Sequence, residues 1–371
     1  MNLDIPSKKL VSELTLAEKQ MVLIARSISK KCKFLILDEP TAPLSNSETE
    51  ELFRIVEDLK KKGVGIIFIS HRMPELFRIC DDITVMRNGK FIIKEKIKNI
   101  TQNEVVEHML GRKLDNQFPK VQVDIGEKLF EVKDVRDDDK LNGINIEVRE
   151  GEIVGVAGLV GAGKTEITKA IFGAEPITSG KIFLRGKEIK LKSPYDAVKQ
   201  GIALVPEERR KEGILVLESV ARNLTAANLG NFTRKASFLN FKKEKKAAKE
   251  MIDRLGIKTP SEETLVQNLS GGNQQKVAIG KWLLSHSDVF IFDEPTKGVD
   301  VGAKKDIYEL ISNLAKNKKG ILYLTSELPE ILGITDRVYV VYDGKVVKEL
   351  ETEKTTEQEL LFYSTGGKAD D

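Results

Sequence analysis

The chain has 371 residues, of which 60 are basic and 57 acidic, so its formal net charge is only +3. This balance argues against a nucleic acid or an anionic membrane surface as partner, and no apolar run approaches the roughly 20 residues of a membrane-spanning helix. The two cysteines, Cys32 and Cys80, match no metal-ligand spacing and are expected to be reduced thiols. The length predicts two domains, each with its own core.

The first 112 residues contain an apolar strand that ends in two acids. In KFLILDEPT, which starts at Lys33, this strand ends in Asp38 and Glu39, and a second apolar strand precedes His71 in FISHRMPE. In nucleotide hydrolases an acid-tipped strand serves a phosphate-binding loop earlier in the chain. No residue before Lys33 forms such a loop, so we interpret residues 1–112 as the C-terminal part of a domain without its phosphate loop.

Residues 113–127 contain Pro119 and mixed charges, which predicts an interdomain linker. The segment 128–364 is predicted to be a complete domain. The tail, residues 365–371, is expected to be disordered because it is short, terminal and rich in glycine and charge.

Within the complete domain, EIVGVAGLVGAGKTEITKAIFG, which starts at Glu152, predicts a buried strand, a glycine-rich turn and a helix. The turn fits the pattern G-x-x-x-x-G-K-[ST] without mismatch. Glycines let successive backbone N–H groups curve around phosphate oxygens, and the helix N-terminus adds its positive dipole end. We expect Lys164 to bridge the β- and γ-phosphates and Thr165 to ligate Mg²⁺. The predicted phosphate-binding residues are Gly158, Gly161, Gly163, Lys164 and Thr165.

Two other interpretations of this turn stay open. A glycine-rich turn with an incidental lysine needs no ligand. A dinucleotide-binding turn needs no Lys-Thr pair and calls for an acid about 20 residues later. The strand before the turn and the helix after it favour the phosphate loop.

A second acid-tipped strand, in DVFIFDEPT, ends in Asp293 and Glu294. Its continuous apolar character is typical of a central parallel strand that is buried on both faces. We expect Asp293 to hold the Mg²⁺ shell and Glu294 to be catalytic, because a general base must orient or deprotonate the attacking water. Shortly before this strand, NLSGG opens a helix at Ser270, Gly271 and Gly272, whose hydroxyl and N–H groups could bind a phosphate.

The chain contains an internal repeat. LTLAEKQ, which starts at Leu14, aligns with LSGGNQQ, which starts at Leu269, and the register continues without a gap at a constant offset of 255 residues. Aligned pairs are Gln20 with Gln275, Asp38 with Asp293, and Gly89 with Gly344. Chance similarity explains so long a register poorly, so we predict one partial and one complete copy of a single domain.

The alternation of apolar strands with helices predicts an α/β fold with a mainly parallel sheet flanked by helices. Short strands with turns near residues 128–190 predict an antiparallel β arm. The strand-poor stretch at about 217–262 predicts a helical subdomain. Its charged run from Phe241 has apolar residues at helical spacing, and the interleaved acids argue against nucleic acid binding.

The order of these motifs resembles that of the ATP-binding subunits of ABC transporters, with Leu269–Asn273 similar to the signature sequence of that family. The runs ISHRMPELFRICDDITVMRNGK, MLGRKLDNQFP and LVPEERRKEGI resemble the tandem-domain ATPases of bacterial monosaccharide importers, ribose-type ones most. The resemblance covers nearly the whole chain. It implies a P-loop NTPase fold of the ABC ATPase type, ATP and Mg²⁺ as ligands, and ATP hydrolysis coupled to sugar transport.

The resemblance also implies partners and a place in the cell. The partners are membrane-spanning permease subunits and, indirectly, a periplasmic or extracellular sugar-binding protein, and the place is the cytoplasmic face of the membrane. In this family each ATP lies between the phosphate loop of one domain and the signature helix of the other. One site would therefore combine catalytic Glu39 and His71 with Ser270 and Gly272, using a phosphate loop that falls before residue 1 in the repeat register. We thus expect a tandem subunit without the first part of its first domain.

The other implied site departs from the family in four ways. Its signature would be Leu14–Glu18, where bulkier residues replace the paired glycines. Ser326 stands at the switch histidine position and lacks an imidazole. Glu207 stands where a glutamine contacting Mg²⁺ is usual. No aromatic residue lies in 131–148 to stack on adenine. We expect this site to bind ATP–Mg²⁺ but to hydrolyse it slowly or not at all unaided.

Two other functions stay open. A soluble ABC-type ATPase outside transport is expected to carry long coiled-coil or basic insertions, which this sequence does not contain. A nucleotide-binding fragment with little hydrolysis fits the predicted lack of a first phosphate loop. Two copies of the chain could also pair to rebuild a nucleotide sandwich.

Overall fold

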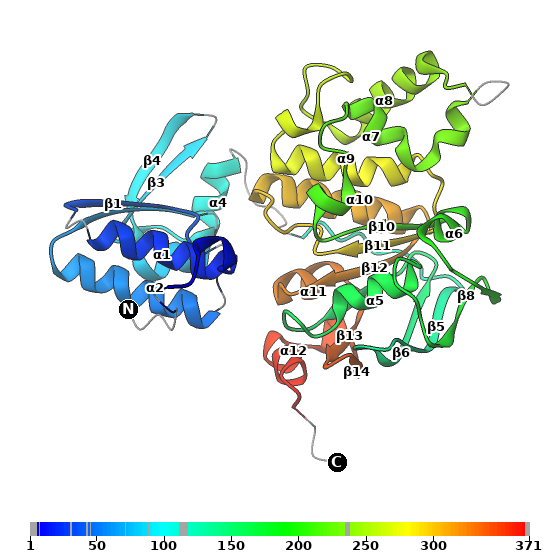
Figure 1. Ribbon diagram of the computed structural model, residues 1–371, viewed down its shortest axis with the longest axis horizontal. Helices are drawn as coiled ribbons and strands as arrows, with labels where there is room; N and C mark the ends of the chain where they lie inside the picture. The colour runs from blue at the N-terminus through cyan, green and yellow to red at the C-terminus, as the bar shows by residue number, and fades with distance from the viewer. Residues whose placement is uncertain are drawn as a thin grey trace. The chain divides into compact units, whose positions relative to one another are not determined.

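The computed structural model describes residues 6, 8–29, 32–41, 44, 46–70, 72–87, 89–110, 118–233 and 238–367. The chain divides into two compact units, Met1–Asp115 (unit 1) and Asn116–Asp371 (unit 2) (Figure 1). The predicted catalytic residue His71 lies outside the described residues, as do 113–117 of the predicted linker and 368–371 of the predicted tail. Among the described residues, none of the helices has both the length and the apolar character needed to cross a bilayer.

Unit 2 is built on a six-stranded sheet with the order β10-β11-β12-β7-β13-β14 (Figure 1). The first five strands in this order run parallel, and β14 pairs antiparallel with β13. Every residue of β7, β10, β11 and β12 is buried, as expected for strands covered on both faces. The strands are β7 (Ile153–Ala157), β10 (Ile202–Val205), β11 (Val289–Asp293), β12 (Gly320–Thr325), β13 (Arg337–Tyr342) and β14 (Lys345–Glu351).

Helices flank this sheet, which confirms the predicted α/β class. Helix α5 contacts β11, α9 contacts β10, α10 contacts β12, and α11 contacts both β7 and β12. The helices are α5 (Lys164–Ile171), α6 (Pro194–Lys199), α9 (Gly271–Leu283), α10 (Val301–Lys316), α11 (Leu328–Ile334) and α12 (Glu357–Ser364). Just after α12, in the predicted tail, the Gly367 N–H donates to the Phe362 carbonyl at 2.9 Å.

Two further parts of unit 2 match the predicted fold class. A four-stranded antiparallel sheet of order β6-β5-β8-β9 forms the predicted β arm. Helices α7 and α8 pack with α9 around a separate apolar core that includes Val220, Leu224, Met251 and Val277. The elements are β5 (Lys128–Arg136), β6 (Asn142–Arg149), β8 (Ser179–Leu184), β9 (Lys187–Ile189), α7 (Val220–Thr225) and α8 (Phe241–Leu255).

Short helical segments connect these elements. In unit 2 they are the π-helical turn η3 (Arg209–Gly213) and the 3-10 segments η4 (Ala226–Phe232), η6 (Val266–Asn268) and η7 (Thr352–Lys354). The described part of the predicted linker packs on unit 2, because the Phe118 ring lies 5.3 Å from the Tyr308 ring, centroid to centroid.

Unit 1 contains two small sheets. Strands β1 and β2 pair in parallel, and β3 and β4 form a separate antiparallel hairpin. Helix α2 packs Leu52, Phe53 and Val56 against Leu35 and Leu37 of β1. The elements are η1 (Val11–Glu13), α1 (Leu16–Ser29), β1 (Phe34–Asp38), α2 (Asn46–Lys61), β2 (Gly65–Ile69), α3 (Met73–Ile79), β3 (Asp82–Arg87), β4 (Lys90–Lys96), η2 (Ile97–Asn99) and α4 (Gln102–Leu110).

Local structure recurs at the offset of the sequence repeat. The bounds of β1, α2, α3, β3 and β4 reappear 255 residues later as those of β11, α10, α11, β13 and β14. The irregularity in the β3–β4 hairpin between Val85 and Met86 reappears between Val340 and Val341. The same sequence signals therefore produce the same local structure twice, and the interpretation of the units as two copies of one domain stays a prediction.

Candidate functional site

The predicted phosphate loop joins β7 to α5. Gly161 and Gly163 have φ values of +88° and +109°, a backbone region that side chains with a Cβ disfavour. A Cβ at Gly158 would lie 2.7 Å from the Val341 carbonyl oxygen. The buried Lys164 ammonium donates to the Gly158 carbonyl at 2.7 Å, and burial lowers the pKa of this lysine. The backbone of the loop thus binds the Lys164 ammonium at the N-terminus of α5.

The turn between β13 and β14 supports this loop from outside. The Gly344 N–H donates to the Ala162 carbonyl at 2.9 Å, and the Asn142 N–H donates to the Gly344 carbonyl at 2.9 Å. A side chain at Gly344 would overlap the Lys140 carbonyl oxygen, and its φ is +67°. Only glycine fits where this turn meets the loop.

Replacement of Gly344 by alanine is therefore expected to lower the free energy of unfolding of unit 2 by more than about 2 kcal/mol. Gly186→Ala is the matched control, since Gly186 has a φ of +74° but no atom within 4 Å of an added Cβ. Its expected cost is about 1 kcal/mol. Urea unfolding followed by fluorescence of Trp282, the single tryptophan, measures both. Equal losses in the two variants contradict the packing argument.

The two predicted acids lie at the end of β11, beside α5. Asp293 is 1% exposed, and the Thr168 hydroxyl donates to its Oδ2 at 3.0 Å. Burial raises the pKa of Asp293 to about 7. Its Oδ1 is buried without a hydrogen-bond partner in the described structure. A buried carboxylate oxygen without a partner in the protein fits a role in binding a ligand.

Glu294 lies next to the phosphate loop lysine. Its carboxylate is 3.8 Å from the Lys164 ammonium, and burial raises the pKa of Glu294. The backbone N–H of Ser326 donates to Glu294 Oε1 at 2.7 Å, and the Thr325 hydroxyl donates to Oε2 at 3.2 Å. At the position predicted for a switch histidine, Ser326 thus contacts the acid through its backbone.

Glu207 lies on the other side of the same site. The Thr165 hydroxyl donates to Glu207 Oε2 at 3.2 Å, and the Lys297 ammonium donates to Oε1 at 2.6 Å. Burial opposes ionisation of Glu207, but the hydrogen bond and charge of Lys297 outweigh it and hold its pKa below the ordinary value. Sequence reasoning missed Lys297, which neutralises the unusual carboxylate.

The structure thus gathers most of the predicted unit 2 site within hydrogen-bonding or ion-pairing reach. Residues that it brings together are Gly158, Lys164, Thr165, Glu207, Glu294 and Ser326, with Asp293 joined through Thr168. Within the described ranges, no group of three or more His, Cys, Asp or Glu side chains forms a metal site by itself. A metal here would therefore need ligands from a nucleotide or water as well.

The signature residues begin α9 and have other contacts. Asn273 donates to the Ser270 hydroxyl at 2.8 Å, and a Cβ at Gly272 would lie 2.6 Å from the Ala303 side chain. Among the described residues, no hydrogen bond joins Ser270, Gly271 or Gly272 to the phosphate loop. At the aligned place in unit 1, the Thr15 N–H donates to Glu18 at 2.6 Å and the Glu18 N–H donates to the Thr15 hydroxyl at 3.2 Å. This helix start is thus capped by its own side chains.

The acids of unit 1 repeat the backbone geometry of unit 2. Glu39 has a φ of +44° and Glu294 one of +45°. Each donates its N–H to the neighbouring strand at 2.9 Å, to Ile69 and to Leu324 respectively. The predicted site that pairs Glu39 with His71 and the signature of unit 2 draws on both units and stays a prediction.

A buried carboxylate lies behind Glu294 in unit 2. Glu330 is 1% exposed and accepts hydrogen bonds from Thr296 at 2.7 Å, Tyr308 at 2.6 Å, Tyr323 at 2.5 Å and Lys304 at 3.0 Å. Burial opposes its charge, but Lys304 and the hydroxyl groups outweigh burial and hold the pKa of Glu330 below its ordinary value. This cluster fixes the turn after Glu294.

The repeat contains the same pair with different surroundings. In unit 1, the Thr41 hydroxyl donates to Glu75 at 2.8 Å, and Arg72 pairs with Glu75 at 3.2 Å. Phe53 and Phe68 stand where unit 2 has its two tyrosines. Sequence reasoning missed both clusters, although the Thr–Glu pair recurs in register and could have revealed them.

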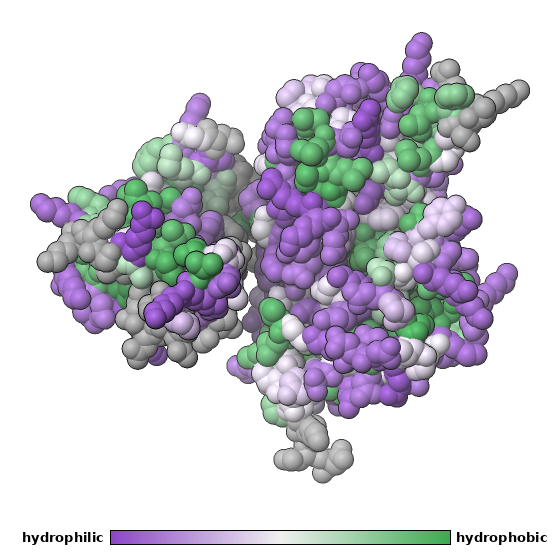
Figure 2. Space-filling view, viewed as in Figure 1, coloured by the Kyte–Doolittle hydropathy of each residue, from purple (hydrophilic) through white to green (hydrophobic). Residues whose placement is uncertain are grey.

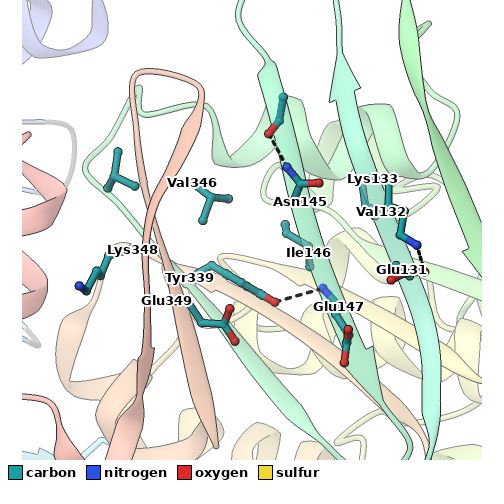
Figure 3. Close-up of a pocket in the computed structure, with 12 residues that line it drawn as sticks. Glu131, Val132, Lys133, Asn145, Ile146, Glu147, Tyr339, Val346, Lys348 and Glu349 are labelled. Carbon is teal, nitrogen blue, oxygen red and sulfur yellow. Dashed lines mark hydrogen bonds and ion pairs between the residues drawn. The ribbon is translucent and has the colours of Figure 1, made fainter.

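A hollow of about 500 Å³ lies elsewhere in unit 2, between the β arm and the β13–β14 hairpin (Figure 3). Its wall includes Tyr339, whose hydroxyl accepts a hydrogen bond from the Glu147 N–H at 3.3 Å, and the ion pair of Lys133 with Glu131 at 3.0 Å. None of its lining residues belongs to the phosphate loop or carries a predicted role. The predicted nucleotide-binding residues therefore lie outside this hollow.

Comparison with known sequences gives the family. Residues 141–297 match the family described as ABC transporter. The chain is 44% identical over 367 residues to a "Putative ribose/galactose/methyl galactoside import ATP-binding protein 1" of Agrobacterium fabrum, which covers 99% of this chain and 73% of that protein. It is 42% identical over 355 residues to a "Ribose import ATP-binding protein RbsA" of Clostridium tetani, which covers 96% of this chain and 70% of that protein.

Solved structures share the fold. A nucleotide-free ATP-binding cassette from an ABC transporter superposes with a TM-score of 0.53 at 21% identity, over 64% of this chain and 99% of that one. The ADP conformation of another such cassette gives a TM-score of 0.52 at 22% identity, over 64% of this chain and 95% of that one. These solved structures show the fold, and the 44% identity over 99% of the chain shows the family: the chain belongs to the ATP-binding proteins of ABC transporters.

Proposed function

We propose that this chain is the ATP-hydrolysing, energy-coupling subunit of an import system for a ribose-like monosaccharide. The observation that carries the proposal is the 44% identity over 99% of the chain to a protein named for ribose and galactose import. The site geometry supports it, because Lys164, Thr165, Glu207 and Glu294 meet at one phosphate loop.

The residues present fit Mg²⁺ together with ATP. The open Oδ1 of Asp293 and the Thr165 hydroxyl are oxygen ligands of the kind that Mg²⁺ prefers. When bound, the ion supplies positive charge to the phosphate oxygens. Lys164 leaves its loop carbonyls to donate to the β- and γ-phosphates. Glu294, held by Thr325 and the Ser326 N–H, orients or deprotonates the attacking water.

The affinity of the site for ATP–Mg²⁺ is expected to depend on pH through Asp293. Because its pKa is raised to about 7, the carboxyl group is protonated below that pH and is then a poor metal ligand. The gain in ATP affinity that Mg²⁺ gives should shrink as the pH falls through about 7. Calorimetric titrations with and without Mg²⁺ on either side of this pH measure it. In the Asp293→Asn variant, only the pH dependence that comes from protonation of ATP itself should remain. A variant with the same pH dependence as the wild-type chain contradicts the assignment of Asp293 to Mg²⁺ binding.

One observation favours a second function, a nucleotide-holding subunit with little turnover. Ser326 offers Glu294 its backbone N–H and its hydroxyl but no imidazole, and Thr15 and Glu18 cap the helix start where a glycine pair is usual. Under this alternative the unit 2 site binds ATP–Mg²⁺ without hydrolysis. Phosphate release measured beside binding separates the two functions.

The proposed function sets the partners and location. The chain docks on membrane-spanning permease subunits at the cytoplasmic face of the membrane, and a periplasmic or extracellular sugar-binding protein delivers the sugar to them. Nucleic acid is not a partner in this proposal, and pairing of two copies is one arrangement that it allows.

A complementation experiment tests the proposal. A Clostridium tetani strain without its own ribose import ATP-binding protein receives this chain or its Lys164→Ala variant, and uptake of labelled ribose is measured. We expect uptake with the wild-type chain and none with the variant. Uptake that does not depend on Lys164 shows that ATP bound at this site does not drive transport. ATP turnover that neither a permease nor a sugar changes argues for an ATPase outside transport.

A further inference from the structure

Exposed apolar side chains lie at the junction between η4 and α8 in the helical subdomain of unit 2. Figure 2 shows apolar residues, in green, among hydrophilic ones at the end of unit 2 that Figure 1 labels α7 and α8. A group of large apolar side chains left in water marks an interaction surface. We call this group the apolar tip; its members are Leu229 (44% exposed), Phe238 (72%), Leu239 (37%) and Phe241 (56%).

Hydrogen bonds hold the backbone that carries the apolar tip. Thr233 and Leu239 pair as an antiparallel bridge, and the Asn240 N–H donates to the Phe232 carbonyl at 2.6 Å. The Asn240 side chain also caps the start of α8. The backbone that follows Phe238 is therefore fixed, and its ring remains at the surface of a held segment.

Positive charge borders the apolar tip. The first nine residues of α8, Phe241–Lys249, contain five lysines and one acid. The acid, Glu244, is 4% exposed and accepts a hydrogen bond from the Thr225 hydroxyl at 2.6 Å, so it is turned away from solvent. Three of the lysines pair with acids further along the chain, but among the described residues no ion pair joins Lys242 or Lys243 to an acid. The net charge of +3 for the whole chain hides this local excess.

An anionic lipid bilayer matches both properties of this surface. Aromatic and aliphatic side chains enter the boundary between headgroups and acyl chains, while neighbouring lysines keep their ammonium groups among the anionic headgroups. Each lysine near such a surface strengthens binding about fivefold. An acidic peptide would match the lysines alone, and an apolar groove would match the rings alone. The combination therefore favours a bilayer.

We propose that the apolar tip, together with Lys242 and Lys243, docks on an anionic lipid bilayer. Phe238 and Phe241 insert below the headgroups, and the two ammonium groups bind headgroup phosphates. This contact is a direct attachment to lipid, beyond the docking on permease subunits in the proposed function. It needs neither a permease nor ATP, so its test is independent of whether the chain drives sugar import.

Vesicle flotation tests the attachment with the full 371-residue chain. One set of vesicles contains phosphatidylcholine mixed with phosphatidylglycerol, and the other contains phosphatidylcholine alone. We expect the chain to float with the first set and to bind the second at least about tenfold more weakly, because the lysines lose their anionic partners. Concentrated salt should weaken binding to the first set, since it screens the lysines. A chain that binds neither set overturns the proposal.

Matched variants separate the two parts of the surface from general effects. Phe238→Ser should weaken binding about tenfold, because its ring no longer leaves water for the acyl boundary. Lys242→Glu should weaken it at least about fivefold. The controls are Tyr195→Ser, at a residue on α6 that is 66% exposed, and Lys190→Glu, at an exposed residue after β9; both should bind like the wild-type chain. Urea unfolding followed by Trp282 fluorescence checks that all four variants remain folded. Equal losses in variants and controls overturn the proposal.

A fluorescence experiment locates the contact. In Phe238→Trp, the introduced indole should be quenched by vesicles whose lipids carry brominated acyl chains. The wild-type chain is the control, because Trp282 is 7% exposed and lies in α9, away from the apolar tip. Vesicle binding without quenching of the introduced indole overturns the proposal. Binding of polyglutamate as tight as that of the vesicles identifies an acidic protein as the partner, and dimers that Phe238→Ser abolishes identify a second copy of the chain; either result also overturns it.

Discussion

Replacement of Lys164 by alanine is expected to weaken ATP–Mg²⁺ binding by about a hundredfold or more. The ammonium is buried, donates to two loop carbonyls and lies 3.8 Å from Glu294, so it is placed to meet phosphate charge. Hydrogen bonds to charged groups contribute about 3 kcal/mol at their upper range, which corresponds to about a hundredfold in affinity. Calorimetry on the two proteins measures the change, with phosphate release followed on the same samples.

The matched control is Lys169→Ala on the same helix. Lys169 pairs with Glu175 at 3.7 Å and with Glu212 at 3.6 Å, near the surface and away from the loop. Its removal should leave ATP affinity unchanged. Equal losses from both variants indicate a general effect on α5. Turnover that requires Lys164 and Glu294 contradicts the expectation of a weak site, because Ser326 then does not disable it.

The second large effect is expected from Glu330→Gln, which should lower the free energy of unfolding of unit 2 by about 3–5 kcal/mol. The substitution removes the buried carboxylate partner of the Lys304 ammonium, which is 17% exposed and keeps only its ion pair with the more exposed Glu327 at 2.7 Å. It also presents an amide N–H₂ to hydroxyl groups that now donate to a carboxylate. Urea unfolding followed by Trp282 fluorescence measures the loss.

Two controls bracket this expectation. Glu357→Gln changes an exposed acid on α12 and should cost less than about 0.5 kcal/mol. Tyr323→Phe removes one donor to Glu330 and should cost about 1–3 kcal/mol. The chain already accepts phenylalanine at the aligned residue Phe68. A Glu330→Gln variant as stable as Glu357→Gln shows that the cluster contributes nothing to stability.

The sequence allowed the fold class to be predicted because its signals are local. The apolar strands, the glycine turn and the helix after Gly163 each depend on neighbouring residues, and the repeat register extends them over both units. The separation of β2 from β3 was not predicted. Pairing of strands depends on what lies between them in space, and nothing in the sequence of either strand records that.

The candidate site was predicted where one motif fixes several residues. Lys164 and Thr165 come from one turn, and Asp293 and Glu294 come from the end of one strand. The contact of Lys297 with Glu207 joins residues 90 positions apart and follows no periodicity. Glu330 was hidden because a buried acid in a short helix has the same local pattern as an exposed one. Only its contacts with Thr296 and two tyrosines reveal the cluster.

The two buried Thr–Glu pairs predict that the stability of the two units depends differently on ionic strength. Glu330 is neutralised by Lys304, with side chains 2% and 17% exposed, whereas Glu75 is neutralised by Arg72, with side chains 10% and 47% exposed. Dissolved ions screen an exposed pair far more than a buried one. Unit 1 should therefore lose stability in concentrated salt sooner than unit 2. The same Thr–Glu pair thus occurs in one unit whose stability is sensitive to salt and in another whose stability tolerates it.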